Sequence, residues 1–130
     1  MSKELTWQEV WHKGFVPCLT IEGLNALRDA ILKNDHRLIQ GRTVQPPCVL
    51  DLPVEGACAI GYSLWMGCAE EPDNIRVDEL FGKACFACDE ALGEKAACRH
   101  FLNQFDEWTR DDMRRELLPE VEKAIASKAY

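Results

Sequence analysis

The chain has 130 residues, of which 47% are hydrophobic and 28% are charged, and its formal net charge is −7 at pH 7. This composition is typical of a globular domain with a packed core and excludes a disordered chain. The excess of acidic residues argues against a nucleic-acid or anionic-membrane surface, because such surfaces bind through Lys and Arg.

The first residues resemble neither a secretory signal nor a transit peptide, because they lack a charged-then-apolar run and include Glu4 and Glu9. The longest strongly apolar stretch, residues 57–68, is shorter than the about 20 residues that a membrane-spanning helix needs. Seven cysteines are an odd number, which argues against a complete disulfide framework. We therefore expect a cysteine-rich cytoplasmic protein with reduced thiols.

Two amphipathic helices open the predicted fold. Thr6 and Glu9 have the spacing of a capping box, and in the short helix that follows Trp7 and Trp11 share one face. Thr20 can cap a second helix. The apolar stripe of that helix consists of Leu24, Leu27 and Ile31.

A proline-containing segment precedes the predicted centre of the molecule. Residues 41–52 include Pro46 and Pro47, and prolines restrict themselves and the residues before them to extended conformations. Pro53 then fits the first turn of a helix, where a missing backbone donor costs nothing. Because residues 53–69 are apolar nearly all round, we expect them to form a buried central helix.

The remaining residues predict a helical hairpin and a last, interrupted helix. Apolar residues recur at three and four positions over residues 77–92, and Gly93 suits the C-cap. Glu94 begins the next predicted helix. Thr109 can cap the last one, which we expect Pro119 to kink or divide.

These patterns predict an all-α fold. It is a single domain, residues 1–130, built as a bundle of six or seven helices around the buried apolar helix at about residues 53–69. The extended connection lies at about residues 41–52. No internal repeat or low-complexity segment divides the chain.

A surface for protein partners is predicted from aromatic and acidic side chains. Residues 70–94 contain eight acids and two bases, which makes one side of the molecule acidic. This pattern fits either a solvated helix face or a docking surface for a basic partner. The candidate residues of the interaction surface are Trp7, Trp11, Glu70, Glu71, Asp78 and Glu79.

The cysteines offer a second candidate site. Cys85 and Cys88 face the same way on a helix, and Cys98 and His100 follow. Zinc needs about four ligands, but Cys98 and His100 point in opposite directions on an ideal helix, so zinc is only an alternative. A redox pair needs a lowered thiol pKa, which the acidic neighbours of Cys88 do not favour. We expect inert thiols, with redox or metal chemistry as the alternative.

A locally basic segment is the third candidate. His36, Arg37 and Arg42 lie just before and within the proline-containing connection, where they could bind an anion or a carboxylate, or simply be solvated. The sequence contains no nucleophile elbow, phosphate-binding loop or dinucleotide fingerprint.

The leading hypothesis is a small helical protein-interaction or regulatory module, whose partner is another protein or a second copy of the chain in a homodimer. The first alternative is a thiol-redox or metal-binding protein that uses Cys85 and Cys88. The second alternative is a small-molecule enzyme or binder with an anion site near Arg37 and Arg42. Without a catalytic motif we lean against an enzyme, and we expect no cofactor and neither a nucleic-acid nor a membrane partner.

Overall fold

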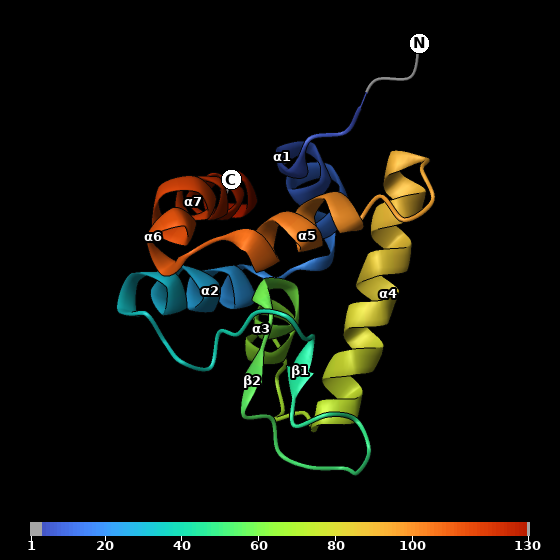
Figure 1. The fold of residues 1–130 in the computed structure, drawn as a ribbon, viewed down its shortest axis with the longest axis vertical. Helices are drawn as coiled ribbons and strands as arrows, with labels where there is room; N and C mark the ends of the chain where they lie inside the picture. The colour runs from blue at the N-terminus through green and yellow to red at the C-terminus, as the bar shows by residue number, and fades with distance from the viewer. Residues whose placement is uncertain (1–3, 130) are drawn as a thin grey trace.

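The computed structural model describes residues 4–129 as an all-α bundle with one small sheet, which confirms the predicted fold class (Figure 1). Its helices are α1 (Trp7–Glu9), which continues through a π-helical turn (Val10–Phe15) and a 3-10 turn (Val16–Cys18), α2 (Ile21–Lys33), α3 (Ala59–Met66), α4 (Asn74–Leu92), α5 (Arg99–Glu107), α6 (Arg110–Asp112) and α7 (Leu118–Ala129), with a second π-helical turn (Met113–Leu117) between the last two. The sheet pairs β1 (Val44–Gln45) with β2 (Gly56–Ala57) in antiparallel register.

Side-chain caps set the helix starts that the sequence predicts. The hydroxyl of Thr6 accepts a hydrogen bond from the Glu9 amide, and that of Thr20 accepts one from Gly23 at 3.0 Å. Thr109 and Asp112 form a full capping box at the start of α6. These caps satisfy amides that have no partner within their own helix.

The apolar helix expected at residues 53–69 is shorter, because it begins at Ala59 with Cys58 as its N-cap. Residues 53–58 are extended instead. Gly56 and Ala57 pair with Val44 and Gln45, and Ala57 also exchanges backbone hydrogen bonds with the segment Arg37–Ile39. Their amides and carbonyls are therefore used in a sheet, and a helix could not satisfy both. As predicted, α3 is almost wholly buried, and it packs against α2 and α4 (Figure 1).

Two further predictions are corrected by backbone details. The helix expected from Glu94 begins at Arg99, because both carboxylate oxygens of Asp89 accept hydrogen bonds from the turn, at Ala96 and Cys98. Pro119 does not divide the last helix, because the backbone stays helical from Arg110 to Ala129, through a π-helical turn at Met113–Leu117. The wider π-helical turn that ends just before Pro119 accommodates its ring.

An aromatic cluster forms part of the core, with Phe101 of α5 at its centre. Five rings lie within 6.4 Å of the Phe101 ring, centroid to centroid, and the nearest is Trp11 at 5.3 Å. The other four belong to Trp7, Phe15, Phe105 and Trp108. The cluster joins the first helical segment to α5.

Glu120 of α7 joins that first segment to the last helix. Its backbone carbonyl accepts a hydrogen bond from the Trp11 indole at 3.2 Å, and its carboxylate lies 2.8 Å from His12 Nε2. Burial of Glu120 acts to raise its pKa, but hydrogen bonds from His12 and Lys123 outweigh this and leave the pKa lowered. The two segments are thus fixed by both a main-chain and a side-chain contact.

Candidate functional site

The loop between β1 and β2 presents aliphatic side chains to solvent. We call residues Pro46–Pro53 the apolar loop; it lies beside the start of α4, at the lower end of the molecule in Figure 1. Val49 is 82% exposed and Leu50 is 65% exposed, and Leu52 is partly exposed. Because these side chains face solvent, they add little to the core and form an exposed apolar group on the surface.

A fully buried asparagine, Asn74, holds this loop in place. Its side-chain amide donates hydrogen bonds to the carbonyls of Pro46 and Pro47, both at 3.1 Å. Its side-chain oxygen accepts from the Leu52 amide at 2.9 Å, and its own amide donates to the Leu52 carbonyl. The two ends of the loop are therefore attached to one side chain at the first turn of α4.

Acidic residues surround the apolar loop. Asp51 within it and Asp73, the N-cap of α4, lie close enough that the charge of Asp73 raises the pKa of Asp51. Together with Glu71 these residues line a shallow hollow of about 300 Å³. Of the acids predicted for the interaction surface, Glu70, Glu71, Asp78 and Glu79 are all exposed. Glu79 pairs with Arg76, and Glu71 accepts a hydrogen bond from the Trp65 indole at 3.0 Å.

The two tryptophans predicted for this surface pack against rings of α5 and its C-terminal end, and Trp11 belongs to the interior. Trp11 is fully buried and stacks on Phe101. Trp7 is half-buried, and its ring meets that of Trp108 edge-on at 4.9 Å. The prediction is therefore corrected for Trp11, which α5 covers, whereas the partly exposed Trp7 stays a prediction for the interaction surface.

The predicted anion site is divided between two places. Arg37 forms a salt bridge with Asp35 at 2.8 Å, and its guanidinium lies over the rings of Tyr62 and Trp65. Hydrogen bonds from the side chain and the backbone amide of Arg37 lower the pKa of the Asp35 carboxyl to about 2. His36 is exposed, and Arg42 lines a separate cavity. The charge of Arg37 is thus neutralised within the chain.

The cysteines predicted for redox or metal chemistry lie where α4 meets the first segment and the start of α5. Burial raises the pKa of all three thiols, Cys85, Cys88 and Cys98. The pKa of Cys88 rises to about 12. A Cβ on Gly14 would lie 2.3 Å from Cys88 Sγ, so Cys88 fills the space beside this glycine. Within residues 4–129 no group of three or more His, Cys, Asp or Glu side chains is placed to hold a metal ion. All seven cysteines are free thiols.

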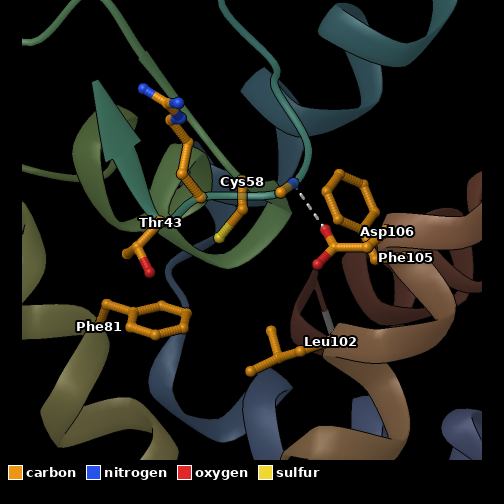
Figure 2. A pocket seen from close by; sticks show the side chains of 8 residues that line it. Thr43, Cys58, Phe81, Leu102, Phe105 and Asp106 are labelled. Carbon is orange, nitrogen blue, oxygen red and sulfur yellow. Dashed lines mark hydrogen bonds between the residues drawn. The ribbon is translucent and has the colours of Figure 1, made fainter. Parts of the chain in front are cut away.

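Arg42 contributes to a cavity of about 180 Å³ between the segment that precedes β1 and helices α3, α4 and α5. Figure 2 shows the side chains of Phe81 and Leu102 on one side of this space, with Cys58 and Asp106 on the other. The cavity is lined by the apolar side chains of Phe81, Leu102 and Phe105 and by the carboxylate of Asp106.

Sequence reasoning missed the apolar half of the interaction surface and its anchor. The signal was the run Val49-Leu50-Asp51-Leu52, which lies between Pro46-Pro47 and Pro53, but Asp51 and Leu52 fit a helix start equally well. Asn74 carried no signal of its own, because its partners lie 22 to 28 residues away.

Comparison of the chain with protein-family models, with curated proteins and with solved structures finds no match. None of the helices in the described part of the chain combines the length and the apolar character that a membrane crossing requires.

Proposed function

We propose that this chain is a protein-interaction module, and that the apolar loop and the acidic start of α4 together bind a partner segment with both apolar and basic side chains. The observation that carries the proposal is the exposure of Val49 and Leu50 on a loop that is attached at both ends to a buried asparagine. The partner's apolar side chains would cover these two residues.

Rigidity supports this assignment. A loop that must be ordered on binding loses conformational entropy at that step, which weakens the complex. The hydrogen bonds of Asn74 fix the loop before a partner arrives, so that cost is largely met in the free protein. A preformed apolar surface of this kind suits a binding module.

Charge determines the kind of partner. Asp51, Asp73 and Asp78 lie near the loop, and Glu71 lines the same hollow. A basic segment would relieve their mutual repulsion, whereas an acidic one would increase it. The same repulsion disfavours a second copy of the chain in this position, because its own acids would face these. The partner is therefore a different, basic protein.

The test selects binding peptides from a displayed library of short random sequences, with the whole chain as the target. Enriched peptides are expected to carry Lys or Arg among apolar residues. Leu50→Ser is expected to weaken their binding by about tenfold or more, as for an anchor at the centre of an interface. Leu32→Ser provides the matched control, because Leu32 is 52% exposed on α2 and lies outside the apolar loop.

Two outcomes would contradict the proposal. One is enrichment of acidic or uncharged peptides. The other is a peptide affinity that is the same for the unaltered chain and for a Val49→Ser/Leu50→Ser double variant. Unfolding curves of each variant show whether a loss of binding reflects a loss of the fold.

A further inference from the structure

The cavity in Figure 2 shares no lining residue with the apolar loop or its acidic hollow and is not used by the proposed function. It opens between Gly41–Thr43 and α5, and its walls include Phe81, Leu102 and Phe105. At about 180 Å³ it slightly exceeds the about 150 Å³ that accommodates a benzene-sized molecule in a protein interior. Its size and walls fit one ring or a short branched aliphatic group.

The carboxylate of Asp106 gives this cavity a defined polar group. Its Oδ1 accepts a hydrogen bond from the Gly41 amide at 3.0 Å, which fixes the orientation of the carboxylate. Among residues 4–129, no lysine, arginine or histidine forms an ion pair with Asp106. Since a carboxylate offers several acceptor positions, Oδ2 retains full capacity for a donor.

Cys58 lines the cavity on the same side as Asp106. Burial raises the pKa of its thiol to about 11, and the charge of Asp106 adds to this effect. The thiol is therefore largely protonated at neutral pH, which argues against a role as a catalytic nucleophile and means that it is alkylated only slowly by excess reagent. It remains a chemical label for the space that a ligand would fill.

We propose that this cavity binds a small organic amine, whose ammonium group pairs with Asp106 and whose apolar body contacts Phe81, Leu102 and Phe105. The aromatic rings suit a cation as well as an apolar body, because their faces carry partial negative charge. Arg42 also lines the cavity, and both it and Asp106 are exposed, so water screens both charges; the Gly41 amide, however, fixes the orientation of the Asp106 carboxylate. This ligand site is independent of the protein-binding surface.

The test compares three ligands of one shape, benzylamine, benzyl alcohol and benzoate, by titration into isotope-labelled protein with amide chemical shifts as the readout. Benzylamine is expected to shift the amides of Gly41, Cys58 and Asp106 and to bind about threefold to fivefold more tightly than the alcohol, the advantage expected for an ion pair with an exposed carboxylate. Asp106→Asn keeps an acceptor for the Gly41 amide and is expected to reduce benzylamine to the affinity of the alcohol. Glu107→Gln, which makes the same charge change at the next residue, is expected to retain that advantage.

A second measurement follows alkylation of Cys58 by mass spectrometry of its peptide. Benzylamine is expected to slow modification of Cys58 and to leave exposed Cys48 unaffected. Equal affinities for amine and alcohol, tighter binding of benzoate, an unchanged affinity in Asp106→Asn, or unprotected Cys58 would each overturn the proposal.

Discussion

The salt bridge between Asp35 and Arg37 joins the end of α2 to the sheet-forming segment, and it gives a clear pH dependence. In the folded chain the pKa of Asp35 is about 2, chiefly because Arg37 donates hydrogen bonds to its carboxylate. An unfolded Asp titrates near 3.9. The resulting stability is therefore fully present above about pH 4 and is lost as the pH falls toward 2.

Replacing Asp35 by Asn tests this contribution. At pH 7 we expect Asp35→Asn to lower the free energy of unfolding by ~1–2 kcal/mol, an estimate reduced for the partial exposure of Arg37. Near pH 2 the difference from the unaltered chain should nearly vanish. Urea unfolding at both pH values measures it, with Asp29→Asn as the control for a more exposed carboxylate. A difference that persists at low pH would contradict the assignment.

The apolar loop depends on one side chain of a neighbouring element. Asn74→Ala would leave the carbonyls of Pro46 and Pro47 and the Leu52 amide without their partner. We expect a loss of ~1–3 kcal/mol in the free energy of unfolding and faster hydrogen exchange at Leu52. Asn103→Ala, on the exposed face of α5, should change neither quantity. Unchanged exchange at Leu52 in the Asn74 variant would show that the loop is held by other contacts.

Close packing of the first segment on α4 requires glycine at position 14. A Cβ on Gly14 would overlap Cys88 Sγ, so we expect Gly14→Ala to destabilise the fold by ~1–3 kcal/mol, with part of the loss recovered in a Gly14→Ala/Cys88→Ala double variant. Gly82 lies in α4, as Cys88 does, and a Cβ added there would meet open space. There the same change should stabilise the helix by ~0.5–1 kcal/mol. Chemical denaturation of the unaltered chain and these three variants shows whether crowding at Cys88 causes the loss of stability in Gly14→Ala.

Most helices were predictable because their signals are local. Thr20 caps α2 from one residue away, and the apolar spacing over residues 77–92 indicates α4. The extended stretch at residues 53–58 was not predictable in this way, because its partners, residues 37–45, are brought to it only by folding. Local pattern alone favoured a helix there.

The acidic half of the candidate site could be predicted, but its apolar half could not. Composition is enough to show that residues 70–79 are rich in acids, and the charged side chains of Glu70, Glu71, Asp78 and Glu79 are exposed in the structure. Periodicity shows that Trp7 and Trp11 share a face, but not that Phe101 covers it. The exposure of Val49 and Leu50 follows from the anchoring of their loop by Asn74, a contact between distant parts of the sequence.

At the scale of the whole molecule, a net charge of −7 should govern how fast a basic partner associates. Long-range attraction accelerates encounter, and dissolved ions screen it over about 10 Å at 0.1 M salt. For a peptide selected on the chain, we expect the association rate constant to fall severalfold between low and moderate salt while the dissociation rate constant changes less. Stopped-flow fluorescence measures both, and a salt-independent association rate would argue against electrostatic attraction.

The contact between Trp11 and Glu120 has a consequence for biosynthesis. These residues are 109 positions apart, so the ribosome must add 109 residues after Trp11 before the first helical segment can meet its partner on α7. Until then, Trp11 and Phe15 lack part of the surface that buries them in the finished protein. The first helical segment therefore lacks its last contact until α7 has been made, and during that time the nascent chain exposes aromatic side chains of the kind that chaperones bind.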